Sequence, residues 1–219
     1  MRWIYIAAGI AFYIKMLLPA PSTPILPFSI VETVVTESGV INAVSGIMFH
    51  SRLYDTVFEV MVFTIAIMGA HFLLEDERPY PKVRRFTDAP SIIMARLGAT
   101  IAALVGIELA IRGHLSPGGG FAAGVAGGTA IGLVAVTSPP EEMQAIYRRW
   151  HVAAWEKVAV LLFILLAFLT LAGVALPHGE TGELFSGGMI PLFNLLVAVK
   201  VALGSWAVVL LFIRYRGLL

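Results

Sequence analysis

Long apolar segments recur along this chain of 219 residues, and they constrain its fold more than any other feature. Hydrophobic residues make up 58% of the sequence and charged residues only 13%, whereas a soluble domain has roughly 25% charged residues. A backbone inside a bilayer must satisfy its own hydrogen bonds, and a helix does so within one segment. The sequence therefore predicts an all-α integral membrane protein that crosses the cell membrane several times.

We expect about six transmembrane helices, separated by loops that are rich in proline or charge. They cover approximately residues 3–18, 54–74, 91–111, 119–136, 152–176 and 189–213. The first is short for a span, and we interpret it as a retained anchor rather than a signal peptide because Lys15 interrupts it. Residues 19–53 form a long connection that begins with closely spaced prolines. Its apolar, β-branched remainder is expected to pack at the membrane interface, as short strands.

Prolines and charges gather between the second and third segments and divide the chain into a two-helix domain, 1–88, and a four-helix domain, 89–219. The basic residues outside the spans fall mostly on one side of the membrane: Arg2, Arg78, Lys82, Arg84, Arg85, Arg148, Arg149, Arg214 and Arg216. The other side has only Arg52 and Arg112. Because cytoplasmic loops carry the excess of Lys and Arg, we expect both termini in the cytoplasm and the long 19–53 loop outside.

The stretch Arg112–Gly132 joins the third and fourth segments and is rich in glycine. Gly120, Gly124, Gly128 and Gly132 recur every fourth residue, so on a helix they would form one bare stripe. Such a stripe allows another helix to approach with its backbone close. We expect this surface to contact a neighbouring helix or subunit.

Ionisable residues inside the predicted helices are candidates for ion transport, because a charge at the bilayer centre costs at least about 2.5–3.5 kcal/mol on insertion scales. Asp55 lies near the outer interface, where solvation explains it, and Glu59 one turn deeper is expected to be buried and protonatable. His71 is interpreted as a hydrogen-bonded interface residue rather than a proton relay. Lys200 is near the middle of the last segment, so it needs a carboxylate, water or a partner subunit.

Of three further polar residues, two have two interpretations each and the role of the third is open. Glu108 precedes Arg112 by four residues, the order that favours an ion pair. That pair is either structural or a carboxylate whose pKa is set by Arg112, so that it loads and releases cations. Glu156 lies one turn into the fifth segment and its role stays open, and Asn194 can supply an amide ligand or bind a helix backbone.

Several classes of function are disfavoured by the composition. The net charge of +1 is too small for a nucleic-acid-binding face. The absence of cysteine removes disulfides and thiolate chemistry. There is no nucleophile–base pair, metal-ligand cluster or phosphate-binding loop in the sequence. We therefore expect no catalytic centre, no metal site and no cofactor on this chain.

The sequence Gly113-His114-Leu115-Ser116-Pro117-Gly118-Gly119-Gly120-Phe121-Ala122-Ala123-Gly124 resembles the G-H-x-x-P-G-G-G-F-x-x-G motif of the B subunit of Mrp-type multisubunit sodium/proton antiporters. The same module occurs in archaeal membrane-bound hydrogenases and their sulfur-reducing relatives. The matching positions are Gly113, His114, Pro117, Gly118, Gly119, Gly120, Phe121 and Gly124. The stretch 186–194 is similar to the last helix of that subunit, and the four segments from Ser91 onward match its layout.

A second resemblance lies upstream of this motif. Asn42, Arg52 and the run Asp55-Thr56-Val57-Phe58-Glu59 resemble the N…R-x-x-D-T-x-x-E pattern in the carboxy-terminal part of the Mrp A subunit. In the hydrogenases that part is a separate two-helix subunit. Phe58 departs from the pattern, which usually has a small residue there. Residues 1–88 thus look like the two-helix subunit, fused to a B-type subunit.

Together the resemblances imply an accessory subunit of an Mrp-like antiporter module that moves sodium ions and protons. The fusion and Lys200 favour a redox-driven respiratory complex, hydrogenase-like or sulfur-reductase-like, over a free-standing antiporter. The implied partners are other Mrp-like antiporter subunits and hydrogenase-like or quinone-oxidoreductase-like redox subunits, within the lipid bilayer. The residues expected in ion translocation are Asp55, Glu59, Glu108, Glu156, Asn194 and Lys200. The alternative is a non-conducting scaffold, in which the glycine stripe and the charges only hold larger subunits together.

Overall fold

The computed structural model describes residues 29–79 and 85–217, and their regular secondary structure is entirely helical. The elements are α2 (Ile30–Ser38), α3 (Ala43–Gly46), the π-helical turn η1 (Ile47–Ser51), α4 (Leu53–Glu75), α5 (Ala89–Arg112), α6 (Gly120–Ala135), α7 (Pro140–Arg149), α8 (Val152–Leu171) and α9 (Ile190–Arg216). All that follows concerns the compact unit that begins at Val31. The first predicted helix, 3–18, and most of the proline-rich stretch lie outside the described residues.

Four of these helices, α4, α5, α8 and α9, are long and apolar enough to cross a membrane. A fifth crossing exists if α2 and the segment Ala43–Ser51, which are bent by 69° at the break between them, count as one span. Helix α6 has 16 residues, fewer than the roughly 20 that a bilayer requires. The predicted all-α membrane fold is therefore confirmed, and every predicted segment from residue 54 onward contains a helix. The side of the membrane on which each terminus lies remains a prediction.

Two predicted connections contain helices. In residues 29–51, for which we expected short strands, the structure has α2, α3 and η1, so that expectation is wrong. Asn42 provides one physical reason, because its side-chain oxygen accepts hydrogen bonds from the backbone N–H groups of Val44 and Ser45 and so caps α3. The polar connection near residue 140 forms α7, which has a proline at its start, acidic residues in its first turn and basic residues in its last turn. That order of charges complements the helix dipole.

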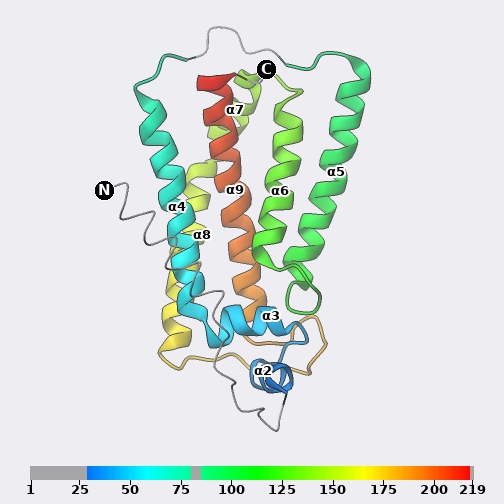
Figure 1. Ribbon diagram of the computed structural model, residues 1–219, viewed down its shortest axis with the longest axis vertical. Helices are drawn as coiled ribbons and strands as arrows, with labels where there is room; N and C mark the ends of the chain where they lie inside the picture. Colours follow the sequence, from blue (N-terminus) through cyan, green and yellow to red (C-terminus); the bar gives the residue numbers. More distant parts are fainter. Residues whose placement is uncertain (1–28, 80–84, 218–219) are drawn as a thin grey trace, which may run out of the picture. The chain divides into compact units, whose positions relative to one another are not determined.

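Helix α9 lies at the centre of the described helices and contacts α4, α5, α6, α7 and α8 (Figure 1). Its buried Phe193, Val197 and Val201 form an apolar core with residues of α4 and α8. The Phe193 ring stacks on Phe49 at a centroid distance of 5.7 Å and meets the edge of Phe163 at 5.4 Å. Through Phe193, helix α9 thus contacts both η1, which precedes α4, and α8.

The glycine stripe of α6 faces α9. A Cβ atom added at Gly120, Gly124 or Gly128 would lie under 3.0 Å from atoms of α9, and at Gly124 it would overlap the side chain of Val201. Gly132 has no neighbouring atom within 4 Å. The expected close contact with a neighbouring helix is therefore confirmed for the first three glycines, and the neighbour belongs to the same chain.

We predict that Gly124→Ala destabilises the protein, whereas Gly132→Ala does not. The methyl group at position 124 would overpack the contact with α9 and cost roughly 1–3 kcal/mol, while the one at position 132 meets no neighbour. The check is thermal aggregation of the purified protein in detergent, together with the amount of chain recovered from membranes. Equal behaviour of the two variants would contradict the role assigned to the stripe.

Candidate functional site

A buried ion pair joins α8 to α9 inside the membrane-spanning part of the chain. The Nζ atom of Lys200 lies 3.2 Å from Oε1 of Glu156, and the two side chains are 1% and 13% exposed. The same Nζ lies 4.1 Å from the centre of the Phe63 ring of α4. Neither atom of the pair forms a further hydrogen bond among the described residues. Three membrane helices therefore meet at one charged point.

The helix positions explain why this pair forms. Lys200 lies about 15 Å along α9 from its first residue, at 1.5 Å per residue, so its ammonium group cannot easily reach the membrane surface. Glu156 lies one turn into α8. Gly204 follows Lys200 by one turn, and an added Cβ atom there would lie 2.9 Å from the Phe63 ring. The bare backbone at Gly204 allows α4 to approach and brings Phe63 next to Lys200.

A buried lysine–glutamate pair has two protonation states in which its net charge is zero. With both groups ionised the net charge is zero, and transfer of one proton from Lys200 to Glu156 leaves both groups neutral. Removing one partner is different, because the remaining buried charge has no counter-charge and typically costs 3–5 kcal/mol. A proton can therefore move within the pair without leaving a net charge in the membrane interior, whereas binding or releasing a cation changes the net charge of the site by one.

The other predicted carboxylates lie on the outside of this chain. Asp55 is half-buried and pairs with Arg52 at the first turn of α4. Glu59 is exposed, so the described part of the chain does not provide the burial that we expected of it. Glu108 and Arg112 lie 3.2 Å apart, the pair that their spacing predicts, and both are exposed. The structure does not bring these residues to the Lys200 site, and their part in ion transport stays a prediction.

The glycine-rich turn between α5 and α6 is held by two asparagines. The Oδ1 atom of Asn194 accepts a hydrogen bond of 2.8 Å from the Gly120 N–H, so Asn194 binds a helix backbone, the second of its two readings. The Nδ2 atom of Asn42 donates to the carbonyl oxygens of Gly113 and Ser116 at 2.7 Å and 2.8 Å. The two predicted domains therefore meet at this turn.

Backbone geometry explains the glycines of the motif. Gly118 and Gly119 have φ angles of 137° and 88°, which side chains disfavour. A Cβ atom at Gly113 would lie 2.7 Å from the Cα atom of Gly119. The motif therefore specifies a tight, closely packed turn rather than an ion-binding loop.

The motif histidine, His114, is fully buried. Burial lowers its pKa below the usual histidine value, and the adjacent backbone of Glu183 and Leu184 partly offsets this effect. Neither ring nitrogen forms a hydrogen bond of good geometry within the described residues. The folded turn therefore favours a neutral imidazole beneath the loop that connects α8 to α9.

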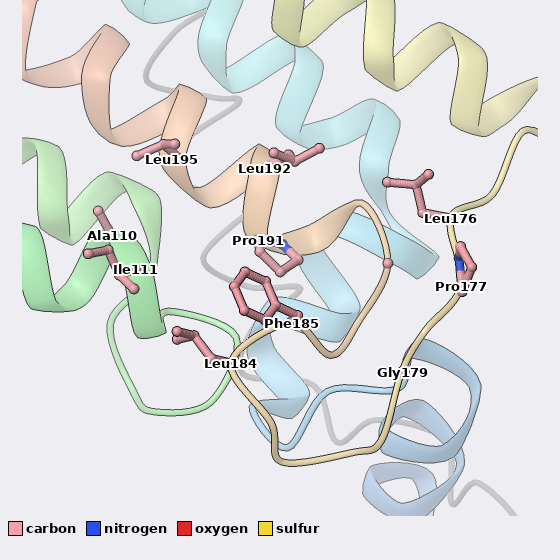
Figure 2. Close-up of a pocket in the computed structure, with 11 residues that line it drawn as sticks. Ala110, Ile111, Leu176, Pro177, Gly179, Leu184, Phe185, Pro191, Leu192 and Leu195 are labelled. Atoms are coloured by element: carbon pink, nitrogen blue, oxygen red, sulfur yellow. The ribbon is translucent and has the colours of Figure 1, made fainter.

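An apolar groove lies near the same turn (Figure 2). It has a volume of about 630 Å³ and is bounded by α5, α9 and the loop between α8 and α9. Its walls include Ile111, Leu184, Phe185, Pro191 and Leu195. No ionisable side chain is among the residues that line it. The groove therefore does not resemble a path for a cation, and the Lys200 site is separate from it.

Two neighbours of the ion pair were not anticipated from the sequence. A glycine inside a helix lowers its stability by roughly 1 kcal/mol relative to alanine, so its presence there calls for a reason. Gly204 follows Lys200 by four residues, which places both residues on one face of the helix. The four-residue spacing between Lys200 and Gly204 was therefore the feature of the sequence that could have revealed this neighbour. Phe63 is one of many apolar residues in α4, and nothing in its local sequence distinguishes it.

We predict that Asn42→Asp loosens the glycine-rich turn. The carboxylate retains the oxygen that caps α3 but loses the donor to Gly113 and Ser116, at a cost of roughly 1–3 kcal/mol. Hydrogen exchange of the amides in 113–119 should become faster. Thr36→Ala is the control, because the Thr36 hydroxyl only donates to Glu32 within α2. Unchanged exchange in Asn42→Asp would contradict this role.

We also predict that acid loosens the loop 176–188 through His114. Its pKa is lowered in the folded state, so the opened state binds a proton more readily. The stabilisation is complete above the usual histidine pKa of about 6.5 and decreases as the pH falls below it. Exchange of the loop amides, corrected for intrinsic rates, should be faster at pH 5.5 than at pH 7.5 in wild type and in His178→Gln. The difference should vanish in His114→Gln, and its persistence there would rule out this mechanism.

Comparisons with known proteins agree with this arrangement. Residues 90–207 match the family described as a domain related to the MnhB subunit of Na+/H+ antiporter. A solved chain of the membrane-bound sulfane sulfur reductase (MBS), an archaeal respiratory membrane complex, is 25% identical with a TM-score of 0.70, and the match covers 96% of each chain. No curated protein sequence matches this chain. The protein is thus a multi-pass membrane protein that belongs to the MnhB-related family of antiporter subunits, as its glycine motif predicted.

Proposed function

We propose that this protein is an accessory subunit of an Mrp-like cation-translocating module in a redox-driven respiratory complex of the cell membrane. The family match and the likeness to a subunit of an archaeal respiratory complex support this proposal. We further propose that the Glu156–Lys200 pair belongs to the ion path. The observation that carries this part is the 3.2 Å contact between a fully buried lysine and a largely buried glutamate on two membrane helices.

The surroundings of the pair suit a site that changes its charge state. Glu156 is the more exposed partner, so a proton or a sodium ion would reach it first. A carboxylate oxygen is a suitable ligand for a hard cation. When Glu156 is neutralised in this way, Lys200 keeps the Phe63 ring as a cation–π partner. The ammonium group can then repel the bound cation and drive it onward.

The exposed carboxylates suit contacts with other subunits. Glu59 lies on a face of α4 that no other described helix covers, and lipid alone would disfavour its charge. A neighbouring antiporter-like or redox subunit would bury it. In this proposal Glu59 and Glu108 extend the ion path into partner chains, sodium ions and protons are the transported species, and both termini face the cytoplasm.

The test compares Glu156→Gln, Lys200→Met and the double variant. Each single variant leaves a buried charge without its partner and should lose stability as well as ion transport. The double variant leaves no such charge, so it should assemble normally and yet fail to transport. The measurement is sodium-dependent and proton transport by inverted membrane vesicles driven by the complex's own redox reaction. Lys157→Gln is the control, because Lys157 is the exposed neighbour of Glu156.

A non-conducting scaffold is the second candidate function. It is favoured by the packing of the glycine stripe on α9 and by the asparagines that hold the motif turn, since both serve only to hold helices together. If the double variant assembles and also transports ions at the wild-type rate, the ion pair is structural. The scaffold would then replace the conducting role.

A further inference from the structure

A second apolar groove is lined by residues of α5, α6, α7 and α9. Helix α7 lies at the end of the helices opposite the glycine-rich turn (Figure 1). Its volume is about 430 Å³. Its walls are formed largely by small and apolar side chains, including Ala103 of α5, Val134 of α6, Ile146 of α7 and Trp206 of α9. Arg96 of α5 is the single charged residue among those that line it.

Arg96 has no acidic partner among the described residues. It is exposed, and within the described ranges its guanidinium takes part in no ion pair. The residues outside the described ranges, 1–28, 80–84 and 218–219, contain no Asp or Glu. A charge in a membrane-spanning helix is costly unless it is paired or reaches the surface. An anion from outside the chain would therefore stabilise Arg96.

The position of the groove favours a lipid as the source of this anion. Arg96 lies about 10 Å along α5 from its first residue, at 1.5 Å per residue, within reach of the headgroup level for a long side chain. Helix α7 buries Met143 and exposes charged residues, and the exposed Trp150 follows it. These features are typical of a helix that lies at the membrane surface. The groove thus leads from the headgroup level into the apolar layer.

We infer that this groove binds one anionic phospholipid, with the phosphate at Arg96 and an acyl chain along the apolar wall. The charge is complementary, and the wall offers a chain largely apolar contacts. Among the described residues, Nε1 of Trp206 in this wall is a buried polar atom that forms no hydrogen bond. Basic pockets between membrane helices on the cytoplasmic side are known to hold anionic headgroups. The inference does not depend on ion transport by the Lys200 site.

The test is native mass spectrometry of the purified complex with phosphatidylglycerol or phosphatidylcholine added. Arg96→Gln should weaken the binding of phosphatidylglycerol roughly fivefold, as expected for the loss of one basic residue near the headgroups. Binding of phosphatidylcholine should not change. Arg149→Gln is the matched control, because Arg149 is exposed on α7 and does not line this groove.

A second variant keeps the test decisive if Arg96→Gln fails to assemble. Ala103→Leu retains Arg96 but fills the groove, so it should reduce the retention of phosphatidylglycerol. Arg96→Lys should retain it. The proposal is overturned if Ala103→Leu binds phosphatidylglycerol like wild type. It is also overturned if a photoreactive group at Thr100, which lines the groove, cross-links to another subunit instead of to lipid.

Discussion

The close packing of α9 on the glycines of α6 is the contact on which the rest of the structure depends. Lipid chains are as apolar as leucine, so membrane helices gain stability from tight contact rather than from leaving water. Gly120, Gly124 and Gly128 provide that contact. It sets the rotation of α9 about its own axis, and as a result Lys200 lies on a different face, against α8 and α4.

This rotation also decides which carboxylate can serve Lys200. Glu156 is the acidic side chain that contacts Lys200. Gly204 has no side chain, so α4 can approach α9 closely enough for Phe63 to lie beside Lys200. Glu59 and Glu108 lie on outward faces. The described part of the chain therefore supplies a single buried ion pair, and a continuous path would need further groups, for which neighbouring subunits are the proposed source.

The family motif has a different role from the one that its histidine suggests. Gly118 and Gly119 adopt backbone angles that favour glycine, and His114 is buried under a loop. Asn42, from the predicted first domain, hydrogen bonds to the motif turn, and Asn194 caps the helix that follows it. The motif thus identifies the family because its geometry is demanding, while the chemistry proposed for the chain lies elsewhere.

The sequence by itself determined the class of the protein. Apolar segments of sufficient length can only be helices in a bilayer, and a stripe of glycines at helical spacing predicts close helix packing. The need of Lys200 for a partner followed from its depth in the last segment. The apolar, β-branched pattern of 30–51 favoured strands. The short helices there depend on the local Asn42 cap and also on hydrogen bonds from Asn42 to Gly113 and Ser116, which lie far away in the chain. Only the tertiary structure decided that Glu156 is the partner and that Glu59 faces outward, because helix rotation is set by packing between helices and not by the sequence of any one of them.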